Sequence, residues 1–341
     1  MVLKRLTEAA GVAGNEGEVR DLLRELVTPH VDEVRGDTLG NLIAVKKGKK
    51  DGPRVMIAAH MDEVGLMIIN IEKSGLLRFT KAGGIDDRVL LGKKVLVGKD
   101  KVPGVIGAKP IHLQEPKERE VPIKVDNLFI DIGAKEQADA EKKVKVGDYA
   151  VFATQYEEFG QDKIKAKALD DRVGCAVLLE VLKDDYEIPI YGAFTVMEEI
   201  GTRGAAVAAY AISPDIGIVL EGTVCADFVA DTPEGHATTS GAGPALSIMD
   251  ATSIGNKVLL RHAVRLAEEN GIPYQFRRAT TGGNDAGRIH LNKEGVPSIS
   301  VSVPCRYIHS PVSVISNSDY ENAIKLVRLF LKSIQEGGLE L

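Results

Sequence analysis

The order of helix-like and strand-like patterns along the chain constrains its fold more than any other feature. Beyond Lys165, amphipathic stretches alternate with apolar runs, which predicts an α/β sheet covered by helices on both faces. The expected helices are residues 172–182, 256–270, 285–293 and 319–335, and the expected strands are residues 190–196, 216–220 and 297–303. From about residue 67 to residue 163 the pattern differs, because short β-type runs such as KKVLVG and DYAVFAT are separated by glycines and charged turns. This middle stretch predicts a compact β domain, barrel-like or sandwich-like.

The segment before the middle stretch has the same α/β character as the segment after it. A helix is indicated by EGEVRDLLRELV, whose apolar residues recur at helical spacing, and a strand is expected at residues 54–59. We therefore predict a discontinuous α/β domain of residues 1–67 and 164–341, with a β domain of residues 68–163 inserted into it. Two domains suit 341 residues, since single cores seldom grow past roughly 250 to 300 residues.

Composition and charge exclude several classes of partner and location. The 43 basic and 49 acidic residues are mixed along the chain, so no basic face is expected to attract nucleic acid. Three cysteines are too few for a disulfide framework, which fits a reducing compartment. The N-terminus lacks the apolar run of a signal peptide, and no window reaches the roughly 18 apolar residues that cross a bilayer. We expect a cytoplasmic protein that binds neither nucleic acid nor membrane.

Five short stretches carry residues able to bind metal ions, each where a strand is expected to end or a helix to begin: AAHMDEVG, KALDDRVG, FTVMEEIGTRG, IVLEGTVCAD and VPCRYIHSP. In the first, His60 and Asp62 lie two residues apart, so both side chains point to one side of an extended chain. His60 can bind a metal while Asp62 orients its ring. A surface histidine and aspartate in a turn would give the same pattern.

Paired acids mark the second and third stretches. Asp170 and Asp171 precede a helix, where a cation would offset their repulsion, although helix capping by aspartate is the alternative. We expect Asp170 to bridge two metal ions, while Asp171 and the arginine after it support the loop. Glu198 and Glu199 follow an apolar strand, which suits a site at the C-terminal edge of a sheet, although acids there also serve solubility. One glutamate of this pair can bind metal while the other transfers a proton.

The last two stretches complete a mixed set of ligands. Glu221 ends the next strand and repeats the strand-end position of Glu199, and His309 follows a strand, although a lone loop histidine often has no function. The expected metal ligands are two histidines and three carboxylates: His60, Asp170, Glu199, Glu221 and His309. Such ligands suit zinc, cobalt or manganese, and a bridging acid would hold two ions roughly 3.5 to 4 Å apart.

This ligand set is the composition of a two-metal hydrolase. A water between the ions would have a pKa near about 7, and a glutamate could take its proton and pass it to a leaving amine. If the metals also bind the free amine of a substrate, the enzyme is an exopeptidase. Motifs for ATP or a dinucleotide are absent from the sequence, so no cofactor other than metal is expected.

The motifs, taken together, resemble those of the tetrahedral aminopeptidases, which are self-compartmentalising dinuclear-metal enzymes. The resemblance covers nearly the whole chain and rests on nine stretches in the family's order: GVAGNEGEVR, DTLGNLIA, AAHMDEVG, GVIGAKPIH, ALDDRVG, VMEEIGTRGA, LEGTVCAD, GGNDAGRIH and RYIHSP. It implies that Glu198 is the general base and Glu199 a ligand. It also implies that His60 and Glu221 serve one ion, that Glu199 and His309 serve the other, and that Asp170 bridges them.

The resemblance further implies a zinc-peptidase-like mixed sheet as the catalytic domain, with a PDZ-like inserted barrel that pairs subunits. Six such dimers would form a hollow dodecamer, and the activity would be release of N-terminal residues from short peptides with free N-termini. Two residues depart from the family's commonest form: Glu221 stands where many relatives have aspartate, and Asn284 where threonine is frequent. The side-chain preference of the enzyme is therefore left open.

Two alternatives are different in kind. The same fold could hydrolyse another amide, and members of this family have also carried an endoglucanase label. A non-catalytic assembly protein could keep the metals without turnover. Glu198 argues against the second alternative, because a proton-transferring glutamate has no structural task once the ligands are present.

Overall fold

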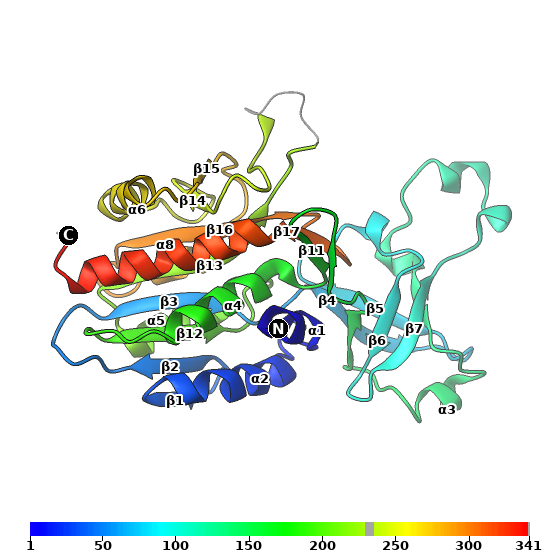
Figure 1. The fold of residues 1–341 in the computed structure, drawn as a ribbon. Coiled ribbons are helices and arrows are strands. Elements are labelled where there is room, and N and C mark those ends of the chain that lie inside the picture. Colours follow the sequence, from blue (N-terminus) through cyan, green and yellow to red (C-terminus); the bar gives the residue numbers. More distant parts are fainter. Residues whose placement is uncertain (229–234, 340–341) are drawn as a thin grey trace.

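A mixed sheet forms the larger part of the computed structural model, which describes residues 1–228 and 235–339 (Figure 1). Its strands are, in spatial order, β1 (Glu33–Gly36), β2 (Leu42–Lys46), β12 (Ile190–Thr195), β3 (Val55–His60), β13 (Ile216–Val224), β16 (Ser298–Arg306), β17 (Ser313–Ser316), β11 (Lys163–Ala166) and β10 (Glu157–Phe159). At one side, β14 (Ala245–Ser247) pairs with β16 and with β15 (Gln275–Arg277). The central strands β12, β3, β13 and β16 are parallel, whereas β1, β2, β17, β11 and β10 join the sheet by antiparallel pairing and β15 pairs parallel with β14.

The central strands are buried along their length, which explains why they read as continuous apolar runs rather than alternating ones. Their register aligns Thr195 of β12 with His60 of β3, and Glu221 of β13 with Ser302 of β16. Because these strands run in the same direction, their C-terminal ends meet at one edge of the sheet. That edge carries the polar residues described below.

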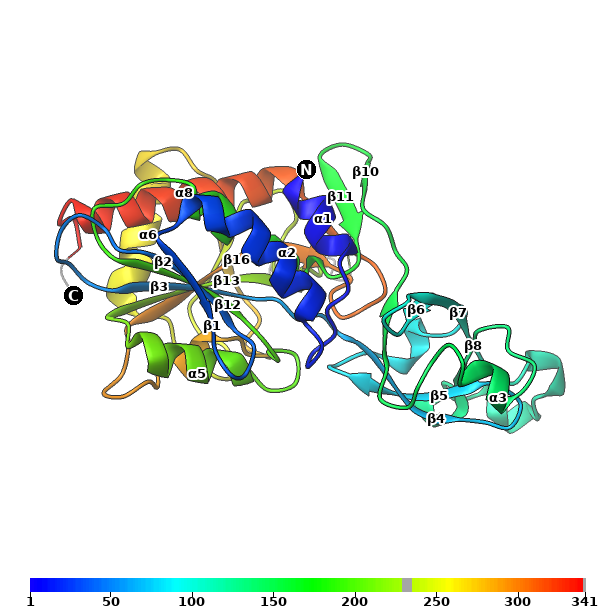
Figure 2. The same cartoon turned by 90° about the horizontal axis from the view of Figure 1, so that it is seen from below.

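Helices cover both faces of the sheet, as the alternation predicted (Figures 1 and 2). One face carries α1 (Val2–Glu8), α2 (Gly17–Val27), α4 (Leu169–Leu182), α6 (Lys257–Glu269) and α8 (Asn317–Gln335). The other carries α5 (Arg203–Ile212) and the short α7 (Ala286–Ile289). Helix α4 is buried on nearly every side, because it lies between the sheet and helices α1 and α8.

The middle of the chain forms a closed antiparallel barrel beside the sheet (Figure 1). Its strands are, in barrel order, β4 (Gly65–Ile71), β5 (Leu77–Ala82), β8 (Phe129–Asp131), β7 (Val102–Gly107), β6 (Lys94–Val97) and β9 (Tyr149–Phe152). Helix α3 (Gln137–Ala140) and three-ten turns at Asp87–Val89, Ile111–Leu113, Pro116–Arg119 and Val125–Asn127 occupy its connections. The barrel encloses its own apolar core, so the prediction of an inserted small barrel is confirmed. The exact domain boundaries stay a prediction.

The structure differs from the sequence prediction at the helix expected over residues 285–293. Helix α7 ends at Ile289, because Lys293 and Gly295 both adopt positive φ angles, of 51° and 105°, and turn the chain into β16. The N–H of Val296 donates to the carbonyl of His290 across this turn. Among the described residues, no helix combines the length and the apolarity that crossing a bilayer requires.

Candidate metal centre

The C-terminal edge of the parallel strands gathers the acids and histidines that the sequence singled out. His60 is the last residue of β3, Glu221 lies in β13, and Glu199 follows β12. His309 lies in the connection between β16 and β17, and Asp170 lies in the first turn of α4. Five separate segments therefore converge on one volume. The barrel begins at the same edge, since β4 starts only a few residues after β3 ends (Figure 1).

Asp170 lies between two histidine–glutamate pairs. Its Oδ1 is 3.3 Å from Nε2 of His60, and its Oδ2 is 3.4 Å from Nε2 of His309. On one side, Glu221 Oε1 is 3.2 Å from the same nitrogen of His60. On the other, Glu199 Oε2 is 3.3 Å from the same nitrogen of His309. The two oxygens of one carboxylate thus face two imidazole–carboxylate clusters.

Three buried carboxylate oxygens at this site have no hydrogen-bond partner among the described residues: Asp170 Oδ1, Glu199 Oε1 and Glu221 Oε2. A buried charge without a partner is costly, so each of these atoms calls for a cation. The potential ligand atoms of His60, Asp170 and Glu199 lie within 4.8 Å of one another. Imidazole and carboxylate donors at this spacing fit borderline divalent ions.

The crowding of acids changes how the site binds protons. Burial, together with the negative charge of Asp170, raises the pKa of Glu199 to about 8, and burial raises the pKa of Glu221 well above its usual range. Burial alone would lower the pKa of His309, but its contacts with Asp170 and Glu199 raise it to about 9. A divalent cation would reverse both tendencies, because it favours ionised carboxylates and neutral imidazoles.

Asp62 contacts both the His60 ring and the loop that follows β12. Its backbone carbonyl lies 3.1 Å from Nδ1 of His60, and its Oδ1 lies 3.4 Å from the same nitrogen, so it can fix the ring orientation. Its two carboxylate oxygens also accept from the backbone N–H groups of Glu198 and Glu199, both at 3.0 Å. Asp62 is therefore an anchor for the loop after β12 as well as for the histidine.

Asp171 differs in environment from its neighbour Asp170, to which it is joined by a cis peptide bond. It is fully buried, and its oxygens accept from the backbone N–H of His60 at 3.1 Å and of Gly174 at 2.9 Å. Both of its oxygens are therefore occupied by backbone groups. Asp170, by contrast, directs its carboxylate between the two histidines.

A buried ion network beside the site was not predicted from the sequence. Glu63 accepts from Lys167 Nζ at 2.7 and 2.8 Å and from Arg172 Nη2 at 3.1 Å. Lys167 also donates to the carbonyl of Ala9 at 2.9 Å, and Arg172 donates to the carbonyl of Met61 at 2.8 Å. All three charged side chains are almost fully buried. The sequence signal was limited to charged residues within two of the ligand stretches, AAHMDEVG and KALDDRVG, and this signal does not identify partners 104 and 109 positions apart.

A cavity of about 270 Å³ opens onto the candidate ligands and is lined in part by Glu198. Arg277 and Asp250 also line it, and neither was predicted. Arg277 donates to the Thr223 hydroxyl at 2.9 Å, and Asp250 accepts from the N–H and the hydroxyl of Thr252. The cavity is therefore polar, and its walls are held in place by their own hydrogen bonds.

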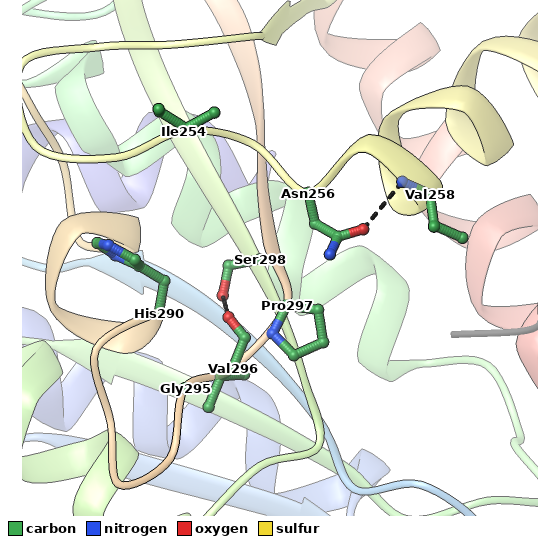
Figure 3. Close-up of a pocket in the computed structure, with 8 residues that line it drawn as sticks. All are labelled: Ile254, Asn256, Val258, His290, Gly295, Val296, Pro297 and Ser298. Carbon is green, nitrogen blue, oxygen red and sulfur yellow. Dashed lines mark hydrogen bonds between the residues drawn. The ribbon is translucent and has the colours of Figure 1, made fainter.

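A second pocket, of about 420 Å³, lies at the opposite edge of the sheet, near the start of β16 (Figure 3). Two of its polar groups have hydrogen-bond partners within the pocket wall: the Asn256 side-chain oxygen accepts from the N–H of Val258, and the hydroxyl of Ser298 donates to the carbonyl of Val296. No acidic residue lines this pocket. Of these two cavities, the one beside Asp170 is therefore the one that carries acidic side chains.

Comparison with known proteins agrees with this geometry. The model of a protein family described as M42 glutamyl aminopeptidase matches residues 40–326, and a second family model, named AMPT, matches residues 2–23. The chain belongs to the M42 glutamyl aminopeptidase family. It is therefore an aminopeptidase, a hydrolase that acts on the N-termini of peptides.

Relatives align with this aminopeptidase over nearly its whole length. The lysyl aminopeptidase of Pyrococcus furiosus is 34% identical over 98% of this chain and 97% of its own. A TET aminopeptidase structure from a marine-sediment Thaumarchaeota archaeon is 38% identical, with a TM-score of 0.94 over 98% of this chain and 97% of its own. The TET1 peptidase of Pyrococcus horikoshii, which can assemble into a tetrahedron or a large octahedral shell, is 33% identical. Its TM-score is 0.86, and the match covers 96% of this chain and 98% of its own. These matches confirm the resemblance to tetrahedral aminopeptidases.

The ion network around Glu63 generates a stability prediction. The Glu63→Gln substitution leaves Lys167 and Arg172 buried without a compensating charge, so we expect the free energy of unfolding to fall by about 3–5 kcal/mol. Urea denaturation followed by circular dichroism measures the free energy of unfolding. Glu25→Gln is the control, because Glu25 pairs with Arg5 on the exposed surface and its loss should cost at most about 1 kcal/mol. Equal losses in the two variants would show that the network does not stabilise the fold.

Proposed function

We propose that this aminopeptidase uses two divalent ions, zinc or cobalt and alternatively manganese, to release N-terminal residues from short peptides. The observation that carries the proposal is the position of Asp170 between two histidine–glutamate pairs. His60 and Glu221 would hold one ion, and Glu199 and His309 the other, with Asp170 shared. When bound, such ions polarise a peptide carbonyl and acidify a water.

Glu198 is the proposed general base. It lines the cavity, its backbone is fixed by Asp62, and no side-chain hydrogen bond of Glu198 is found among the described residues. Its carboxylate is therefore available to accept a proton from a water and to deliver that proton to the amine of the departing peptide. Asp62 assists by holding both the His60 ring and the loop that bears Glu198.

The assembly of subunits is a further part of the proposal. The barrel of residues 68–163 would pair subunits into dimers, and the remainder of the chain would form the catalytic domain. Dimers would assemble into a hollow dodecamer, a proposal supported by the tetrahedral shell that the TET1 peptidase can form. An enclosed site would admit short peptides and exclude folded proteins.

Chelation and metal restoration test the activity. We expect the purified enzyme to lose hydrolysis of aminoacyl p-nitroanilides after dialysis against a chelator, and to regain it with zinc, cobalt or manganese. N-acetylated peptides should remain uncut in every sample, because they lack the free amine. Release from acetylated peptides, or equal activity with and without metal, would contradict a metal-dependent aminopeptidase. A metal-loaded protein without activity on any peptide would favour the non-catalytic alternative.

The shared position of Asp170 predicts a specific pattern of metal loss. Asp170→Asn should reduce the bound metal from two ions per subunit to none, because both sites lose a charged ligand. Glu221→Gln and Glu199→Gln should each weaken one site and retain about one ion. Elemental analysis of each variant after gel filtration gives the stoichiometry. Loss of a single ion in Asp170→Asn would contradict the bridging role.

The role of Glu198 is tested by Glu198→Gln, which keeps the size of the side chain but removes its basicity. We expect kcat to fall by about 10²- to 10⁴-fold while two ions stay bound. Metal analysis and steady-state kinetics on one aminoacyl p-nitroanilide are measured on the same preparation. Full activity in this variant would remove Glu198 as the base.

A further inference from the structure

Side chains from three distant segments hold the loop that carries Glu198 and Glu199 by accepting hydrogen bonds from its backbone. Four consecutive N–H groups, from Val196 to Glu199, each donate to a side-chain oxygen. Val196 N–H donates to Asn41 Oδ1 at 3.0 Å, and Met197 N–H donates to Glu16 Oε1 at 3.1 Å. The next two donate to the carboxylate of Asp62, both at 3.0 Å. The loop position therefore depends on side chains more than a hundred residues away in sequence.

Glu16 belongs to the N-terminal GVAGNEGEVR stretch, for which the metal centre and the proposed mechanism give no role. Its side chain is buried, and its Oε1 also accepts from the N–H of Gly14 at 2.7 Å. Gly14 has a φ of 87°, and a Cβ there would lie 3.1 Å from the hydroxyl of Tyr149. The N–H of Gly11 donates to Glu63 Oε1 at 3.1 Å, which fixes the other end of this turn. The turn thus presents one carboxylate oxygen to Met197.

Met197, whose N–H donates to Glu16, has an unfavourable backbone conformation. Met197 has a φ of 55°, in the left-handed region that costs a non-glycine residue free energy. Its carbonyl accepts from the N–H of Arg203 at 3.1 Å, but its N–H has Glu16 as its acceptor. Glu16 gives this part-buried N–H the acceptor that it would otherwise lack, so Glu16 stabilises the turn at this residue.

We propose that Glu16 is a positioning residue for catalysis: by holding the N–H of Met197 it fixes the backbone from which Glu198 projects into the cavity. The inference rests on the proposed role of Glu198 as general base. Glu16 does not line the cavity, so it acts on the direction of the Glu198 carboxylate and not on the affinity for substrate. Displacement of a reacting group by about 1 Å can cost on the order of 100-fold in rate, so the effect belongs in kcat.

Two substitutions at Glu16 separate positioning from charge. Glu16→Ala removes the acceptor, and we expect kcat to fall by about 10- to 100-fold with KM within about twofold and with the wild-type metal content. Glu16→Gln should stay within about threefold of wild type, because a single oxygen accepts both N–H groups and the glutamine carbonyl can replace it. Glu18→Ala, in the first turn of the helix that follows Glu16, is the matched control, since Glu18 pairs with Lys101 at a half-exposed position, and it should keep wild-type kinetics.

A double-variant cycle tests whether Glu16 acts through Glu198. Adding Glu16→Ala to Glu198→Gln should cause no further loss of kcat, because the base is already absent. A wild-type kcat in Glu16→Ala, a loss of bound metal, a rise in KM alone, or an additive loss in the double variant would each overturn the positioning role, even while Glu198→Gln remains inactive. If Glu198→Gln keeps full activity, the proposed base fails, and the positioning role fails with it.

Discussion

Three carboxylates and two imidazoles converge on one small volume, in which His60 and the acids are largely buried and His309 is partly exposed, and the rest of the structure depends on holding them there. Glu199 and Glu221 each place one oxygen beside a histidine, and Asp170 places both of its oxygens beside histidines. Each of the three acids has a buried oxygen without a hydrogen-bond partner among the described residues. Like charges in a medium of low dielectric constant repel strongly, so such an arrangement separates unless cations and a rigid frame oppose the repulsion. The parallel strands provide that frame, because their ends are fixed by a sheet in which every central strand is buried.

The acids at this edge divide into two kinds by what their oxygens contact. Asp62 and Asp171 each accept from two backbone N–H groups, so both oxygens of each carboxylate have hydrogen-bond partners without an ion. Asp170, by contrast, has a buried oxygen without a hydrogen-bond partner among the described residues, as do the two glutamates beside the histidines. This difference separates supporting acids from candidate ligands more clearly than their spacing in sequence does. Adjacent residues such as Asp170 and Asp171 thereby take different tasks.

The sequence was informative where burial imposes a pattern, and uninformative where a contact joins distant residues. Apolar runs predicted the central strands, and because parallel strands end at a common edge, the acids after them could be expected to meet. Helix α5 was missed because RGAAVAAYAI is rich in small residues and lacks a charged face. The contacts of Glu63 with Lys167 and of Glu16 with Met197 could not be predicted, since no local pattern identifies partners 104 and 181 positions apart.

The insertion of a barrel beside the candidate metal centre requires that its connections do not move the candidate ligands. The outgoing connection leaves β3 at His60, and Gly65 begins the barrel so close to the N-terminal turn that a Cβ would lie 2.4 Å from a methyl group of Val12. The returning connection passes through β11, which pairs with β17 in the large sheet. Glu63 on the outgoing side and Lys167 on the returning side form a buried ion pair at 2.7 Å. The pair therefore fixes both connections next to the candidate ligands, so the barrel can be carried at this edge without displacing His60 or Asp170.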